Sequence, residues 1–139
     1  MIGKKLKGFT LMELVMVVAV IAIIAAISIP GILDSKKSAN EASAIQYMRT
    51  WGTAQEIYYR KNGIYADSDE KLVNYITITK GDGDGYSFSV DTIRGVTWFG
   101  RGSPISPGIS GDRHFYISMS GVIRYAHKRP ANLTDTPIK

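Results

Sequence analysis

A run of apolar residues near the N-terminus constrains this chain more than any other feature of its sequence. Every residue from Leu14 to Ile29 is apolar except Ser28. As a helix, residues 9–29 would extend about 32 Å, enough to cross a hydrocarbon core of about 30 Å. The alternative is a buried helix of a soluble domain, but 139 residues offer no core large enough to surround such a helix. The run therefore predicts a membrane-spanning segment.

The charges on either side of the apolar run predict its orientation. Lys4, Lys5 and Lys7 precede it, and Asp34 follows it. Because basic residues stay on the cytoplasmic side of a membrane, we expect a cytoplasmic N-terminus and an external position for everything after Pro30. A secretory signal is the alternative, but the Ile-Ser-Ile-Pro-Gly-Ile sequence at the end of the run does not resemble a small-residue cleavage site. The run should therefore stay in the mature protein.

Glu13 is the only charged residue between Phe9 and Leu33. An ionised side chain inside a bilayer is unfavourable, so a charge at this position indicates a function. The alternative is that Glu13 lies near the cytoplasmic face and reaches water.

The sequence KGFTLMELV at residues 7–15 resembles the N-terminal signal of type IV prepilins and the related pseudopilins. The resemblance implies that a membrane enzyme, the prepilin peptidase, cleaves between Gly8 and Phe9 and methylates the new amine of Phe9. It also implies that Glu13 is the assembly glutamate, which neutralises the terminal amine of Phe9 in a neighbouring subunit.

Pro30 and Gly31 match the family's helix-breaking proline region. Proline has no N–H to bond the Ala26 carbonyl, and glycine adds backbone freedom, so we expect a kink or local unwinding here. The alternative is a helix that simply ends. We expect the helix to continue, because Ser38-x-x-Glu41 resembles a capping box and a helical segment follows.

The remainder of the chain predicts one helix on an antiparallel sheet. Residues 34–62 have apolar residues at helical spacing, and Asn62-Gly63 is a stop signal. We expect Trp51, Tyr58 and Tyr59 to cover the sheet, the alternative being a stacking or electron-carrying stripe. The following segments predict a short helix at 69–75, a turn at 81–85, strands at 86–90 and 95–100, and a hairpin of 114–118 with 122–125. This is an α+β fold with a long N-terminal helix, as in pilins.

Three segments result from this pattern. Residues 1–8 form a leader peptide, residues 9–33 a transmembrane and assembly helix, and residues 34–139 an extracytoplasmic pilin-like domain that includes the lower half of the helix. The chain has no cysteine, which excludes disulfides and thiolate metal sites. Many pilins close their C-terminal loop with a cysteine pair, so here we expect the hairpin and packing alone to hold residues 126–139.

Other candidate sites are weaker. Asp82 and Asp84 lie in a glycine-rich turn, but no distal glutamate completes a calcium loop, and we expect a plain turn. His114 and His127 lack a carboxylate pattern that would indicate zinc or catalysis. Asn132-Leu133-Thr134 is a short glycosylation sequon. We expect no enzyme activity, no cofactor and no metal.

The net charge does not indicate a nucleic-acid partner. Loss of the three leader lysines lowers it from +5 to +2, and no basic stripe remains.

The combined features predict a structural subunit of a type IV pilus. The subunit would reside in the inner membrane as a single-pass protein with a cytoplasmic N-terminus, in contact with lipid. After processing it would polymerise with identical or related pilins on an inner-membrane assembly platform, forming an extracellular fimbrium for adhesion, motility or DNA uptake. The alternative is a pseudopilin of a type II secretion system. A monomeric membrane-anchored binding module or enzyme is a third class, against which Glu13 and the Gly8–Phe9 motif argue.

Overall fold

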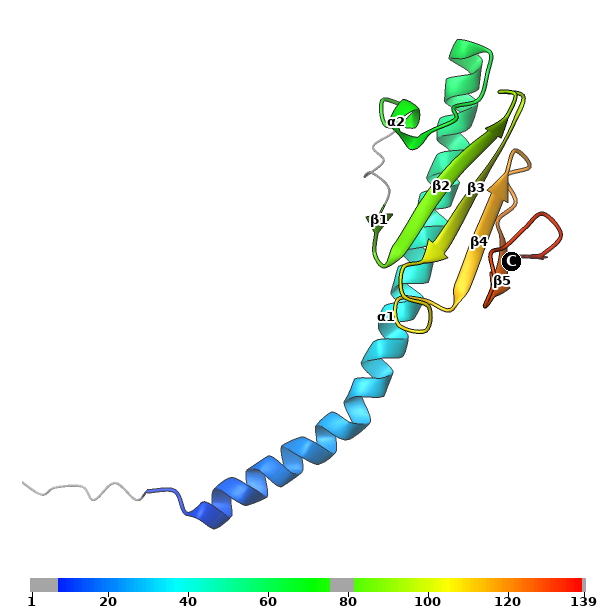
Figure 1. The fold of residues 1–139 in the computed structure, drawn as a ribbon. Helices are drawn as coiled ribbons and strands as arrows, with labels where there is room; N and C mark the ends of the chain where they lie inside the picture. Colours follow the sequence, from blue (N-terminus) through cyan, green and yellow to red (C-terminus); the bar gives the residue numbers. More distant parts are fainter. Residues whose placement is uncertain (1–7, 76–81, 139) are drawn as a thin grey trace, which may run out of the picture. The chain divides into compact units, whose positions relative to one another are not determined.

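The computed structural model describes residues 8–75 and 82–138 (Figure 1). The chain divides into two compact units, Met1–Ser35 and Lys36–Lys139. Helix α1 (Leu11–Asn62) contributes its first part to the first unit and its second part to the second.

In the first unit, α1 exposes its apolar side chains. The exposed fractions of its large apolar side chains run from 46 % at Leu33 to 81 % at Leu11. Among the described residues, α1 is the one helix whose length and composition would allow it to cross a membrane, and none of its apolar window is buried. A surface this apolar needs lipid or protein to cover it.

Pro30 lies inside α1 and does not interrupt it. The chain is helical on both sides of Pro30 and through Gly31. The Ser35 hydroxyl donates a hydrogen bond of 2.8 Å to the Gly31 carbonyl oxygen. The expected local unwinding is therefore wrong, and the continuation of the helix is confirmed. A kink at Pro30 stays a prediction.

The described residues of the second unit form a six-stranded antiparallel sheet in which every strand pairs with the next along the chain. The order is β1 (Asp82–Gly83), β2 (Tyr86–Ile93), β3 (Thr97–Pro104), β4 (Arg113–Ser118), β5 (Arg124–His127) and β6 (Thr136–Pro137). A short helix, α2 (Asp69–Leu72), precedes the sheet. Figure 1 shows the second part of α1 lying along one face of the sheet. The predicted α+β fold is confirmed.

Some predicted boundaries are wrong. Strand β3 begins at Thr97 instead of residue 95, because Arg94 and Gly95 have positive φ values of 55° and 68° and form the β2–β3 turn. Strand β5 begins at Arg124 instead of residue 122, and α2 ends at Leu72 instead of residue 75. Of the predicted turn at 81–85, residue 81 lies outside the described residues.

The core lies between α1 and the sheet. Its largest fully buried side chains include Trp51 and Met48 from the helix and Tyr86, Phe115 and Ile117 from the strands. The edge of the Trp51 ring lies so close to Gly100 of β3 that a Cβ atom there would be 2.7 Å from it. The prediction that helix aromatics cover the sheet is confirmed for Trp51, and Tyr58 is partly buried against the core. It is wrong for Tyr59, whose side chain is 41 % exposed.

Helix α1 ends at the predicted signal. Gly63 adopts a φ of 73° and its N–H donates a hydrogen bond of 2.8 Å to the Tyr59 carbonyl oxygen. This left-handed conformation is the one that glycine adopts without steric cost at a helix C-terminus.

Candidate processing site and the contacts that hold the domain

The Gly8–Phe9 junction lies in non-helical chain just before α1 begins. Phe9 is 86 % exposed, and a Cβ built on Gly8 would meet no atom within 4 Å. A peptidase needs an accessible backbone outside a helix at the bond that it cuts. The junction satisfies that requirement, while its cleavage and the methylation of Phe9 stay predictions.

Thr10 and Glu13 form a reciprocal cap at the start of α1. The Glu13 Oε2 atom accepts hydrogen bonds from the Thr10 backbone N–H at 2.9 Å and from the Thr10 hydroxyl at 2.8 Å. The Glu13 backbone N–H donates in return to Thr10 Oγ1 at 3.2 Å. This is the capping box of a Thr-x-x-Glu sequence, which satisfies backbone donors at a helix N-terminus. Glu13 therefore has a local role in addition to the predicted role in assembly.

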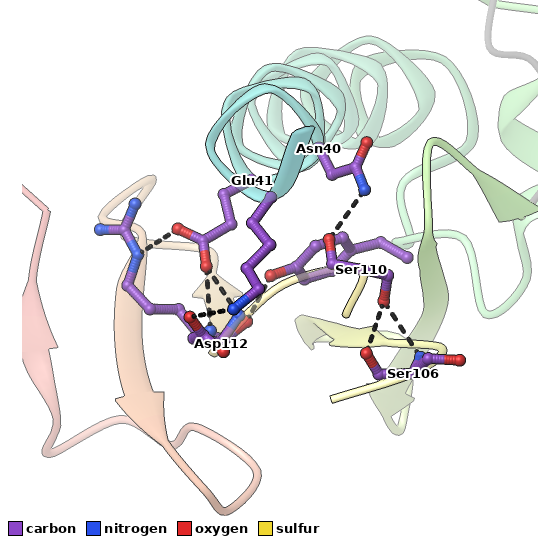
Figure 2. A network of polar contacts seen from close by, with 8 residues as sticks. Asn40, Glu41, Ser106, Ser110 and Asp112 are labelled. Carbon is purple, nitrogen blue, oxygen red and sulfur yellow. Dashed lines mark hydrogen bonds and ion pairs between the residues drawn. The ribbon is translucent and has the colours of Figure 1, made fainter. Parts of the chain in front are cut away.

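The capping box predicted at Ser38-x-x-Glu41 is wrong. The chain is already helical from Leu11, so no helix begins near Ser38. Glu41 instead points away from its own helix toward the loop between β3 and β4 (Figure 2).

Glu41 holds the end of that loop with both carboxylate oxygens. Oε1 accepts hydrogen bonds from the backbone N–H groups of Asp112 at 2.9 Å and Arg113 at 3.1 Å. Oε2 accepts from Arg113 Nε at 2.7 Å. The Glu41 side chain is only 10 % exposed, so these three donors replace the water that its charge would otherwise require.

Two neighbours on α1 extend this contact. Asn40 Nδ2 donates to the Ser110 carbonyl oxygen at 2.8 Å, and Lys37 Nζ lies 3.4 Å from Asp112 Oδ2. Figure 2 shows Asn40 and Glu41 reaching from one side of the helix to the same loop. Sequence reasoning missed this contact. Its only signal was a pair of polar side chains, Asn40 and Glu41, at the start of a helix segment that faces a sheet.

The C-terminal segment is held by an ion pair as well as by strand pairing. The Asp135 carboxylate accepts from the Arg129 guanidinium on both oxygens, one contact being 2.9 Å, and from the Asn132 N–H at 2.8 Å. The hydrogen bonds from Arg129 hold the pKa of Asp135 below its usual range. Strand β6 then pairs with β5, and the Ile138 N–H donates to the Ile123 carbonyl oxygen at 2.9 Å.

The expectation for residues 126–139 is therefore wrong in one respect. Packing and the hairpin do not act alone, because the ion pair between Arg129 and Asp135 also joins two points of this segment. Asn132 and Thr134 of the sequon lie in this loop, and the Thr134 hydroxyl donates to Asn132 Oδ1 at 2.8 Å.

The candidate metal and catalytic residues are dispersed. The Asp84 carboxylate accepts a hydrogen bond of 2.5 Å from the Ser43 hydroxyl. Residue 82 is described only as part of strand β1. His114 Nδ1 lies 3.1 Å from Ser103 Oγ, and burial lowers the pKa of His114. Across the described ranges 8–75 and 82–138, no three His, Asp or Glu side chains gather as metal ligands would. The absence of a metal site and of catalysis stays a prediction.

Comparison with known proteins agrees with the N-terminal motif. Residues 3–29 match the profile of the prokaryotic N-terminal methylation motif. The chain is 30 % identical to a type IV wide pilus major component, PilA4, of Thermus thermophilus over 67 % of this chain and 79 % of that protein. It is also 30 % identical to the type II secretion system core protein G of Vibrio cholerae, over 53 % of this chain and 51 % of that protein.

The long apolar helix, the antiparallel sheet and the methylation motif define a pilin-like protein. The chain belongs to the family of type IV pilins and pseudopilins.

Proposed function

We propose that this chain is a structural subunit of a type IV pilus. Its precursor resides in the inner membrane through residues 9–33, with the N-terminus in the cytoplasm. Prepilin peptidase cleaves it between Gly8 and Phe9 and methylates Phe9. An inner-membrane assembly platform then adds it to identical or related subunits, and the product is a surface filament.

The observation that carries the proposal is the exposed apolar surface of residues 9–33 directly after an accessible Gly8–Phe9 junction. In the precursor, lipid would cover this surface. On leaving the membrane, the same surface needs an equally apolar environment, and a bundle of identical helices provides it. Glu13 fits such a bundle, because its carboxylate can pair with the positive terminal amine that cleavage creates on Phe9 of an adjoining subunit.

The same surface would serve a pseudopilin of a type II secretion system, which is the second candidate. The similarity to the Vibrio cholerae secretion protein favours it. We prefer the pilus, because the similarity to the Thermus thermophilus pilus component extends over a larger share of both chains.

Two measurements test the proposal in the native host. Mass spectrometry of membrane and filament fractions should find a mature protein that begins with N-methylated Phe9. A terminus near Gly31 would instead indicate a secreted protein and would overturn the proposal. Immunogold electron microscopy should place the protein along surface filaments, whereas processed protein confined to the envelope would identify a pseudopilin.

A further inference from the structure

The loop between β3 and β4, residues 105–112, carries two exposed isoleucines. Ile105 is 58 % exposed and Ile109 is 67 % exposed, and the residues between them are serine, proline and glycine. A single exposed isoleucine is ordinary on a protein surface. Two on one short polar loop form a local apolar patch that water solvates poorly.

The loop is held in a fixed conformation by its own hydrogen bonds. The Ser110 backbone N–H donates to the Ser106 carbonyl oxygen at 2.8 Å, and the Ser106 N–H donates to Ser110 Oγ at 3.0 Å. The Gly108 N–H donates to the Gly111 carbonyl oxygen at 3.0 Å. Ile105 and Ile109 are therefore attached to a loop backbone that hydrogen bonds hold in place.

The loop is also attached to one end of the α1 segment in this unit. Asn40 binds the Ser110 carbonyl and Glu41 binds the Asp112 N–H, as Figure 2 shows. A shallow hollow is lined by Lys36 and Asn40 on the helix side and by Ile105 and Ile109 on the loop side. Exposed Lys36 and the apolar patch are thus neighbours on the same surface.

Lys36 lies shortly after the end of the apolar run in the sequence. It is three residues after Leu33 in the sequence, so even a fully extended chain would separate the two by no more than about 11 Å. If residues 9–33 span a membrane, as in the proposed function, the chain leaves the bilayer next to the residues that hold the 105–112 loop.

We propose that the 105–112 loop rests on the phospholipid bilayer while the subunit is stored in the membrane. Ile105 and Ile109 enter the boundary between headgroups and acyl chains, and the Lys36 ammonium binds lipid phosphate. Apolar side chains beside a basic residue are the chemistry of an interfacial membrane contact. This inference rests on the membrane anchorage in the proposed function.

The opposite end of the sheet offers a matched control. Ile93 and Val96 flank the β2–β3 turn and are exposed by 58 % and 68 %. The pairing of Ile93 with Thr97 lies at one end of β2, and the pairing of Tyr86 with Pro104 lies at the other. The control pair is therefore equally apolar and remote from the 105–112 loop.

The test uses the uncleaved full chain in vesicles of phosphatidylethanolamine and phosphatidylglycerol. Because the chain has no cysteine, a fluorophore can be attached to one introduced thiol at a time: Ser106→Cys in the loop, Val96→Cys at the far turn and Ser28→Cys in the apolar run. Quenching by lipids spin-labelled near the headgroup end of the acyl chain reports contact with the bilayer. We expect strong quenching at Ser28→Cys and Ser106→Cys and almost none at Val96→Cys.

Substitution then identifies the cause of the contact. Ile105→Ser with Ile109→Ser should reduce quenching at Ser106→Cys to the Val96→Cys level, while Ile93→Ser with Val96→Ser should leave it unchanged. All four side chains are exposed, and the fluorescence of buried Trp51 and Trp98 checks that the domain remains folded.

Each other outcome contradicts the inference in a different way. Quenching at Ser28→Cys but not at Ser106→Cys overturns the loop contact and leaves the anchorage intact. Absence of quenching at Ser28→Cys overturns the anchorage and the inference together. Quenching at Ser106→Cys that stays unchanged in the Ile105→Ser and Ile109→Ser variant overturns the contact of the two isoleucines with the bilayer.

Discussion

Glu41 and Arg113, far apart in the sequence, are joined by two hydrogen bonds. Glu41 Oε1 accepts from the Arg113 backbone N–H at 3.1 Å, and Oε2 accepts from Arg113 Nε at 2.7 Å. The first bond fixes the backbone at the start of β4, and the second neutralises the carboxylate. These bonds fix the end of the 105–112 loop against the part of helix α1 that carries Glu41.

Glu41→Ala should destabilise the domain by about 2 kcal/mol. The substitution leaves the Asp112 and Arg113 backbone N–H groups without an acceptor, and part-buried donors without partners are costly. The measurement is the free energy of unfolding of the full chain in detergent micelles, followed by the fluorescence of Trp51 and Trp98.

Glu41→Gln is the matched comparison. Its amide oxygen can still accept from the two backbone N–H groups, while the ion pair and the hydrogen bond from Arg113 Nε are lost. Its effect should be smaller than that of Glu41→Ala. Equal effects would mean that the contact with the Arg113 side chain, and not the backbone hydrogen bonds, holds the loop.

Gly100→Ala should destabilise the domain by about 1–3 kcal/mol, as overpacking of a core does. The new methyl group would lie 2.7 Å from two ring carbons of Trp51 and 3.2 Å from Ile117 Cγ2. The helix and the sheet would have to move apart to admit it. Thermal unfolding with the same tryptophan signal measures the change.

Gly52→Ala is the control, because it adds a methyl group to the opposite side of the same interface. Its Cβ would lie 3.6 Å from Ile117 Cδ1, an ordinary contact, and alanine favours a helix over glycine by about 0.5–1 kcal/mol. Gly52→Ala should therefore stabilise the domain. Destabilisation by both variants would show that the interface tolerates no added volume on either side.

The fold was more predictable from the sequence than these contacts. The apolar run, the Gly63 stop and the alternation in residues 86–90 are local patterns, and a local pattern suffices to predict a helix or a strand. Glu41 was misassigned because Ser-x-x-Glu is also a local pattern, whereas the true partners of Glu41 lie 71 and 72 positions away. The capping box at Thr10-x-x-Glu13 was not predicted, because both interpretations of Glu13, as an assembly partner and as a group that reaches water, left out its hydrogen bonds to its own helix.

The role of Asp135 predicts a dependence on pH. Hydrogen bonds from Arg129 lower the pKa of Asp135 in the folded chain below its ordinary value of about 3.8. The unfolded chain therefore takes up this proton more readily, and acid favours unfolding. The stabilisation by Asp135 is complete above the unfolded pKa and is lost as the pH falls through the lower, folded pKa.

Asp135→Asn tests this dependence. At pH 7 the variant should melt at a lower temperature than the parent chain, and the difference should shrink once the pH falls below about 4. The parent chain and the variant both contain His114, so its titration affects both melting temperatures and does not contribute to their difference. Asp91→Asn is the control, because Asp91 Oδ2 lies 3.6 Å from Arg101 in an exposed pair that should contribute little at either pH. A difference for Asp135→Asn that persists unchanged at pH 3 would exclude the ion pair as its cause.

Glu13 has a local role that the structure describes and an assembly role that we propose, and two substitutions separate them. Glu13→Gln removes the charge but keeps an oxygen that can accept from the Thr10 N–H and hydroxyl, so the cap of α1 should survive. Thr10→Ala removes the hydroxyl from the cap, at a typical cost of about 1 kcal/mol, and leaves the Glu13 charge in place.

We expect both precursors to insert in the membrane and to be cleaved after Gly8, because the leader and the scissile bond are unchanged. Only Glu13→Gln should abolish filament growth, because the terminal amine of Phe9 in the next subunit would be buried in an apolar bundle without a counter-ion. Membrane level, cleavage state and the yield of sheared filaments are measured for both variants. Normal filaments from Glu13→Gln would contradict the pairing mechanism, and loss of filaments from Thr10→Ala alone would show that the cap limits assembly. Failure of Glu13→Gln to insert would place its role earlier, in targeting.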